Sequence, residues 1–258
     1  MKKPYSLVII TIVIVLTLFA ANKLLRLTSA YIAGKAGQQV TKQTVEAQLK
    51  AITEAPYDSL EPTSAKQQFT TKLPRIIAVS LNNGILEVSA GKDTAVSFMS
   101  RHFGQVPQLK NLTSEGYEIV RIDPVDYENE KRVVTLPTTQ IHILNVATGV
   151  GSLSVDLRKV AVTESNLSVG IGTLAVTATD KMDSKLSLAN GLGSISVSVP
   201  EKNGFIVTLP QGLQLNSSLA KLTDAEKNVY TSINYDTAKI KTKIDVANAS
   251  GFNILTTK

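Results

Sequence analysis

The sequence contains no cysteine and no tryptophan, and only two of its 258 residues are histidines. Without a thiol the chain can form no disulfide bond, no thiolate metal site and no cysteine nucleophile. His142 alternates with Ile141 and Ile143, as a side chain on the outer face of a strand would, and His102 falls in a predicted turn. Because neither histidine has a ligand partner at metal-site spacing, no metal centre and no cofactor are expected.

Negative charge is absent from the first 35 residues, where five basic residues supply most of the net charge of +6. These five are Lys2, Lys3, Lys23, Arg26 and Lys35. The rest of the chain is close to neutral and has no basic stripe with interleaved aromatic residues, which make up only 5% of the sequence. The electrostatic footprint of a nucleic-acid surface is therefore missing, and no nucleic-acid partner is expected.

Residues 4–22 form an uncharged apolar run, PYSLVIITIVIVLTLFAAN, with lysines on both sides. A helix of this length would span about 28 Å, close to the thickness of the hydrocarbon core of a bilayer. We therefore predict one transmembrane helix within an N-terminal anchor, residues 1–34. The bulky residues before Ala20 and Ala21 make a poor signal-peptidase site and favour an uncleaved signal-anchor. Cleavage after Ala30 is the alternative.

The short N-terminal tail carries two lysines and the α-amino group, which favours the cytoplasmic side of the membrane. This orientation predicts a single-pass cell-membrane protein whose chain from about residue 35 onward is extracytoplasmic. Residues 35–72 are then a juxtamembrane stalk. Val45, Leu49 and Ile52 recur there at helical spacing before two prolines end the pattern. An amphipathic partner-binding helix is the alternative for this segment.

The period of the sequence changes to two from Leu73 onward. Leu86 and Val88 alternate with Glu87 and Ser89 after an Asn-Asn-Gly turn, and similar short runs separated by turns follow. Only residues 217–227 show any helical pattern in this part of the chain. The pattern predicts an all-β domain over residues 73–258.

A repeat of about 21 residues runs through this domain as GVGSLSVDL, GIGTLAVTA and GLGSISVSV. The glycine pairs are Gly149 and Gly151, Gly170 and Gly172, and Gly191 and Gly193, with Gly212 as a decayed fourth copy. A repeat of this size predicts stacked β-strands, in a solenoid-like arrangement. Alternation within each unit predicts inward aliphatic side chains, namely Leu153, Val155, Leu157, Leu174, Val176, Ile195, Val197 and Val199. The outward positions are mostly serine and threonine.

The glycine pairs also resemble the start of a nucleotide-binding turn. A dinucleotide fingerprint needs a third glycine three residues later and a helix after it, whereas Ser154, Ala175 and Ser196 occupy that place and strand follows. No nucleotide site is expected. We instead assign the glycines to backbone conformations of positive φ, which only glycine adopts cheaply.

Four stretches carry a resemblance to a known family: residues 82–98, 135–155, 186–210 and 241–255. With their glycine, alternating aliphatic residues and proline-ended strands, they resemble the putative-adhesin β-strand repeat family of bacterial envelope proteins. This toastrack-type domain also forms the C-terminal part of cell-wall-active-antibiotic response proteins. The resemblance covers residues 73–258, less closely over 99–132, and implies a stacked β-repeat domain outside the membrane without known enzymatic activity.

The resemblance and the anchor together predict a non-enzymatic β-repeat domain for interaction, adhesion or scaffolding at the cell envelope, with an envelope protein or the cell wall as partner. A module that senses envelope stress is the alternative. An envelope hydrolase with a site near residues 99–132 is a third hypothesis. Its candidates are His102, Asp123, Asp126, Glu128 and Glu130, which would have to converge in one pocket. The simpler interpretation of the acidic residues is a solvated loop beside Lys131 and Arg132.

Overall fold

The structure is a computed structural model that describes residues 42–102, 105–124, 129–215 and 217–257. The predicted membrane segment, residues 4–22, lies outside these residues. Within them, no helix is both long enough and apolar enough to cross a membrane. The described chain is nearly all β, with one α-helix, α2 (Lys42–Thr53), and one 3-10 turn, η1 (Tyr57–Ser59). The expected all-β class and stacked sheet are confirmed.

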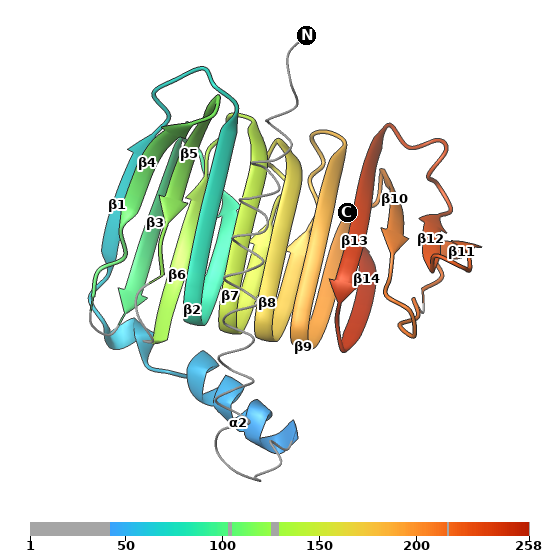
Figure 1. The fold of residues 1–258 in the computed structure, drawn as a ribbon, viewed down its shortest axis with the longest axis horizontal. Coiled ribbons are helices and arrows are strands. Elements are labelled where there is room, and N and C mark those ends of the chain that lie inside the picture. The colour runs from blue at the N-terminus through green and yellow to red at the C-terminus, as the bar shows by residue number, and fades with distance from the viewer. Residues whose placement is uncertain (1–41, 103–104, 125–128, 216, 258) are drawn as a thin grey trace.

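The strands form one continuous sheet whose neighbours run side by side along the molecule (Figure 1). Up to the first glycine repeat the strands are β1 (Thr63–Gln68), β2 (Arg75–Ala90), β3 (Ala95–His102), β4 (Leu109–Ser114), β5 (Tyr117–Ile122) and β6 (Asn129–Leu136). The glycine repeats are β7 (Ile141–Asp156), β8 (Val162–Thr177) and β9 (Ser184–Pro200). The C-terminal strands are β10 (Asn203–Thr208), β11 (Ala220–Asp224), β12 (Val229–Ser232), β13 (Ile240–Asn248) and β14 (Gly251–Thr257).

The centre of the molecule is a stack of four long parallel strands, β2, β7, β8 and β9. Gly84, Gly151, Gly172 and Gly193 share one register position across this stack. In the half of the stack before this position, β2 pairs with β5 at one end and β9 pairs with β13 at the other. In the half after it, β2 pairs with β6 and β9 pairs with β14. We call these two parts of the sheet the first layer and the second layer.

The alternation of buried residues slips by one at the glycines. In β8 the inward residues are Leu167 and Val169 before the pair and Leu174 and Val176 after it, so odd positions give way to even ones. A strand that bends there can keep facing one core with both of its halves. The glycine pair is therefore a bend inside a strand and not a turn between two strands.

The second glycine of each pair forms a column of close backbone contacts. Gly84, Gly151, Gly172 and Gly193 have φ between +136° and +142°. A Cβ atom on Gly172 would lie 1.7 Å from the carbonyl oxygen of Gly151, and one on Gly193 would lie 1.8 Å from that of Gly172. These positions require glycine both for their φ and for the close approach of the neighbouring strand.

The assignment of positive φ to every repeat glycine was too broad. Gly149, Gly170 and Gly191 do not have positive φ. Gly170 still leaves no room for a side chain, since a Cβ atom there would lie 2.4 Å from the carbonyl oxygen of Gly149. Gly212 is not a fourth member of the column. It has φ +87° in a turn, with nothing within 4 Å of a Cβ atom, because the chain has left the stack by then.

The next rung of the stack after β9 is formed by two shorter strands, which come from later in the sequence than the repeat predicts. The strands that follow directly in the sequence, β10, β11 and β12, do not pair with β9 and lie beyond β13 in the sheet. The chain then returns as β13, which pairs in parallel with the first half of β9, and as β14, which pairs with the second half. Residues 217–227 form β11 and a turn and no helix. The fourth copy is thus replaced by residues 240–257, outside the 21-residue frame.

The other end of the stack is closed by shorter strands. β6, β3 and β1 extend the second layer, while β5 and β4 extend the first. β1 lies within the segment predicted as a stalk, so the sheet begins at Thr63 and not at Leu73. Helix α2 begins the described chain and lies against β2 and β7, below the strands in Figure 1.

Candidate interaction surface

The predicted inward residues lie between the two ends of the stack in continuous rows. Leu153, Leu174 and Ile195 share one register position, and so do Val155, Val176 and Val197. These six residues, Leu157 and Val199 are all at most 2% exposed. The rows continue into Leu86 and Val88 of β2 and into Phe252 and Ile254 of β14. These buried rows therefore hold each strand in register with the next and fix the orientation of the outward side chains.

The serines and threonines between these core residues face outward on the second layer. Ser152 pairs with Thr173 and Thr173 with Ser194, so that hydroxyl groups line up across β7, β8 and β9. We call this surface the hydroxyl face, made of Ser152, Ser154, Thr173, Thr177, Ser194, Ser196 and Ser198. Strand geometry spaces such groups about 4.8 Å apart across the strands and about 6.8 Å apart along them.

One charged residue, Asp156, shares the outward rows of these three strands. Arg158 donates from Nη2 to Asp156 Oδ2 at 2.6 Å, and this hydrogen bond lowers the pKa of the Asp156 carboxyl. The charge is therefore paired with a neighbour at the end of β7. The hydroxyl face has short side chains and is nearly neutral. It therefore offers many weak hydrogen-bonding groups and no strong electrostatic attraction.

The outer face of the first layer is more highly charged. Asn166 donates to Asn145 at 2.9 Å across β8 and β7. Ion pairs join neighbouring strands or residues on this layer: Lys185 with Glu164 at 3.7 Å, and Lys243 with Asp245 at 3.4 Å. The two outer faces therefore differ in chemistry although one strand contributes to both.

Two adjoining hollows lie where the turns after β7, β8 and β9 meet the segment before β13. Their volumes are about 520 Å³ and about 360 Å³. The larger is lined by Arg158, Asp180, Pro200, Glu201, Lys202, Asn203 and Ile240. Charges of both signs stand close together there, and of the candidates for hydrolysis that the structure describes, His102, Asp123 and Glu130 line neither hollow.

Three of the residues proposed for an enzymatic site lie near one another, since His102 is opposite Glu130 across β3 and β6 and Arg132 donates to the Asp123 carbonyl, but each carboxylate is held in its own ion pairs. Asp126 and Glu128 lie outside the described residues. Burial opposes ionisation of Asp123, but hydrogen bonds and charge from Lys110 and Arg121 outweigh it and lower the pKa of its carboxyl. A proton acceptor with a lowered pKa and two cationic partners is poorly suited to general acid or base chemistry near neutral pH.

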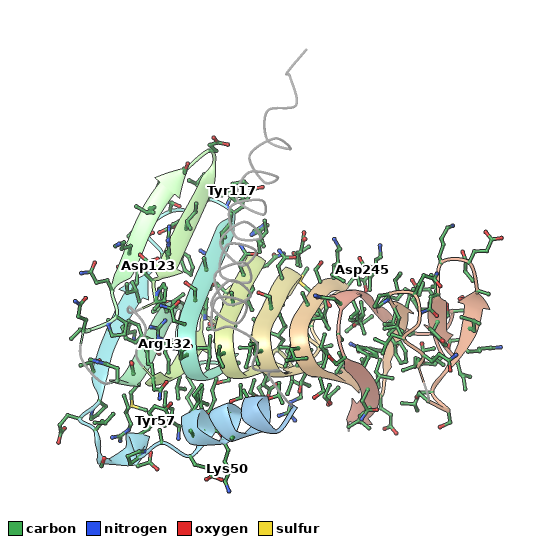
Figure 2. All side chains as sticks on the ribbon, turned by 60° about the horizontal axis from the view of Figure 1, so that its bottom comes forward. Lys50, Tyr57, Tyr117, Asp123, Arg132 and Asp245 are labelled. Carbon is green, nitrogen blue, oxygen red and sulfur yellow. The ribbon has the colours of Figure 1, made fainter. Side chains whose placement is uncertain are left out.

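Glu130 belongs to a buried ion pair and not to a solvated loop. Arg132 is fully buried and donates to both carboxylate oxygens of Glu130, at 2.6 and 2.8 Å. Ser100 donates to the same carboxylate, and Arg132 also reaches the carbonyl oxygen of Ser80 at 2.9 Å. Arg132 was expected to flank the loop in solvent, but alternation in β6 turns it inward. Figure 2 labels Arg132 at the same end of the stack as Tyr57.

Tyr57 and His102 complete this end of the molecule. Burial, together with the charge of Glu130, raises the pKa of Tyr57 to about 12, and its hydroxyl donates to the carbonyl oxygen of Ile52 at 2.8 Å. His102 Nε2 is 3.1 Å from the Thr63 hydroxyl. Within the described ranges no cluster of histidine, aspartate and glutamate could hold a metal ion. The Tyr57 contact ties η1 to α2, and the His102 contact ties β1 to β3.

Glu118 is a second buried carboxylate that the sequence did not single out. It accepts hydrogen bonds from the backbone and hydroxyl groups of Thr70 and Thr71 and from the Asn111 amide, at 2.7 to 3.1 Å. Burial alone would raise its pKa, but these donors lower the pKa to about 2. With every oxygen satisfied, Glu118 fastens the segment after β1 to β5.

Comparison with protein-family models finds no match, and no curated protein matches the chain. Among solved structures, a "putative cell adhesion protein" from Clostridium sporogenes ATCC 15579 is similar with a TM-score of 0.60. The two sequences are 16% identical, and the match covers 76% of this chain and 100% of that one. At this identity the likeness shows the fold alone.

A second structure, a "putative adhesin" from Parabacteroides distasonis ATCC 8503, matches with a TM-score of 0.25 and 12% identity. It covers 55% of this chain and 71% of that one, and it carries no argument here.

Proposed function

We propose that this chain is a non-enzymatic, adhesion-type interaction domain of the bacterial cell envelope, with the toastrack-type repeat as its scaffold. The observation that carries the proposal is the hydroxyl face, in which the register of β7, β8 and β9 aligns seven hydroxyl side chains over a rigid core. The fold shared with a protein described as a cell adhesion protein supports it.

The geometry favours an extended, uncharged partner, and we take this to be a cell-wall polysaccharide. Hydroxyl groups are both donors and acceptors, so they can exchange hydrogen bonds with sugar hydroxyls in either sense. Each such bond contributes little on its own, and the strength of binding must come from repetition along the stack. A regular array suits a regular polymer better than it suits a small molecule.

In the same proposal, residues 4–22 hold the domain at the membrane and place it outside the cytoplasm. The apolar run between lysines supports this arrangement. Treatment of intact spheroplasts with a protease tests it. The domain should be degraded from outside while a cytoplasmic marker survives, and a fully protected chain would contradict the orientation.

Binding by the hydroxyl face is tested with the full chain in detergent and purified cell-wall polysaccharide in a co-sedimentation assay. The double variant T173K/S196K places two long cations on the face and should reduce binding at least tenfold. The matched control S168K/S187K puts the same charges on the outer face of the first layer, where ionic groups already lie, and should bind as the original chain does.

Two outcomes of this experiment would contradict the proposal. Equal losses in both double variants would show that binding does not use the hydroxyl face. Absence of binding by the original chain to any cell-wall fraction would reject a polysaccharide partner.

A further inference from the structure

Four strands of the described chain pair with a neighbour on one side only: β1, β4, β11 and β14. Three of them carry a lysine, namely Lys66, Lys110 and Lys221. Charged side chains, lysine above all, are a common device that prevents another strand from adding to an open edge. β14, with the sequence GFNILTT, has no charged residue and no proline.

The open edge of β14 presents backbone groups at alternate residues. The Ala178 N–H donates to the Ser198 carbonyl at 2.8 Å, so the backbone groups of Ser198 face β8 and those of Val197 and Val199 face β14. Successive residues of a strand direct their N–H and C=O groups to opposite sides. Val197 therefore bonds Asn253 and Leu255, which flank its partner Ile254, and Phe252, Ile254 and Thr256 direct their backbone groups away from β9. No strand within the described ranges lies on that side.

β14 also lies at a step between the two layers. In the first layer the stack continues from β13 to β10, whereas the second layer ends at β14. The Leu255 side chain on its outer face is 49% exposed, and Phe252 on its inner face is only partly buried against the core. Both the backbone edge and the end of the core are thus left incomplete at one place.

We propose that β14 pairs antiparallel with β14 of a second copy of this chain, about a two-fold axis at Ile254. Phe252 then lies opposite Thr256 of the partner subunit, and these are residues whose backbone groups face outward. The buried Ile254 meets its own counterpart, so the two cores become continuous. Self-pairing of an uncharged strand brings no like charges together.

A symmetric pair of this kind closes both open edges at once and ends further growth, whereas head-to-tail addition would continue into a fibre. A seven-residue strand pair with its flanking side chains is a small interface, and we expect a dissociation constant on the order of 10 µM. This dimer extends beyond the proposed function, since the hydroxyl face lies on strands that the pairing leaves uncovered.

The test is the mass of the full chain in detergent by sedimentation equilibrium, over about 1 to 200 µM, a range that brackets the expected constant. Leu255→Lys introduces on β14 the charge that the other edges have. Thr256→Pro removes one outward N–H while leaving the pairing with β9 intact, which edge strands tolerate. The matched control is Leu222→Lys, on the edge strand β11, where the leucine is 50% exposed.

We expect the original chain and Leu222→Lys to shift from monomer to dimer over this range, and the two β14 variants to stay at least tenfold less associated. Circular dichroism of both variants checks that they remain folded. A chain that stays monomeric overturns the proposal, and so does a dimer that Leu255→Lys and Thr256→Pro leave unchanged. A monomer that takes up a strand peptide instead would assign the edge to another protein.

Discussion

At the scale of single residues, the strictest requirement falls on the second glycine of each pair. Gly151, Gly172 and Gly193 each need a conformation that side-chain-bearing residues avoid, and each lies against the carbonyl group of the preceding rung. A Cβ atom at any of these positions would therefore incur both backbone strain and a steric clash. Gly212 has a positive φ but no neighbour close to a Cβ atom, so it should be far easier to replace.

Gly172→Ala should lower the free energy of unfolding by about 3 kcal/mol or more, because the strain in φ adds to a clash with backbone that cannot move aside. Gly212→Ala should cost only about 1 kcal/mol, from the positive φ alone. Urea denaturation of both variants measures the difference. Similar midpoints for the two would mean that the column is not closely packed.

Glu118 makes the stability of the fold sensitive to acid. Its pKa is about 2 in the folded chain, below the ordinary value of 4.5, so its contribution is complete above that ordinary value. The contribution is lost as the pH falls from 4.5 towards 2, because the unfolded chain takes up the proton first. Glu118→Gln should be less stable at pH 7 and should show a flatter loss of stability across this window. Thermal unfolding between pH 7 and pH 2 checks it, and parallel curves would contradict it.

The burial of Glu130, Arg132 and Glu118 was not predicted from the sequence, although the alternation in β6 indicated it for the first two. In β6, NEKRVVTL, Glu130 and Arg132 occupy the same alternate positions as Val134 and Leu136, which are fully buried. The alternation could have placed both charges inside, two residues apart and of opposite sign. Four of the five donors around Glu118 belong to Thr70 and Thr71, 48 and 47 positions away, so nothing local in the sequence predicts them, and the fifth belongs to Asn111, seven positions away.

At the scale of elements, the alternation of aliphatic and hydroxyl residues was enough to predict the strands of the repeat and their inner face. It could not show that a glycine pair lies inside one strand, because a bend and a turn leave the same pattern. It also missed Gly84, whose strand repeats the glycine and the alternation but lies outside the 21-residue frame. The intervening β3 to β6 displace it in sequence and not in space.

Leu174→Asp should unfold the rungs on both sides, since it buries a charge that has no partner within a row of aliphatic side chains. Thr173→Asp places the same group on the exposed face one residue earlier and should change stability by less than about 0.5 kcal/mol. Leu174 is 1% exposed and Thr173 is exposed. Solubility and circular dichroism of the two variants decide, and a soluble, folded Leu174→Asp chain would contradict the inner row.

At the scale of the whole molecule, the sequence predicts a stack but not how it ends. Each central rung contacts the rung before and after it, so local repetition is sufficient to assemble β7, β8 and β9. The end strands pair across long separations, as β1 does with β3 and β14 with β9. Those contacts leave no periodic trace, which is why the stalk prediction included β1 and the fourth repeat was placed at Gly212.

Protection of backbone amides against hydrogen exchange should follow position in the stack. Amides of β8 should exchange most slowly, because β7 and β9 cover both of its edges along its length, and those of β1, β4 and β11 should exchange first. Exchange followed by mass spectrometry of peptides measures this order. Equal protection of edge and central strands would show that the domain opens only as one unit.

The central stack, in which β7, β8 and β9 follow one another in both sequence and space, has a mechanical consequence. Tension along the stack acts along the hydrogen bonds between strands and loads one pair of strands at a time. A rung that peels away releases its 21 residues, which extend to about 70 Å of chain. A tether built in this way lengthens in equal steps under load, and so limits the force that reaches its attachment points.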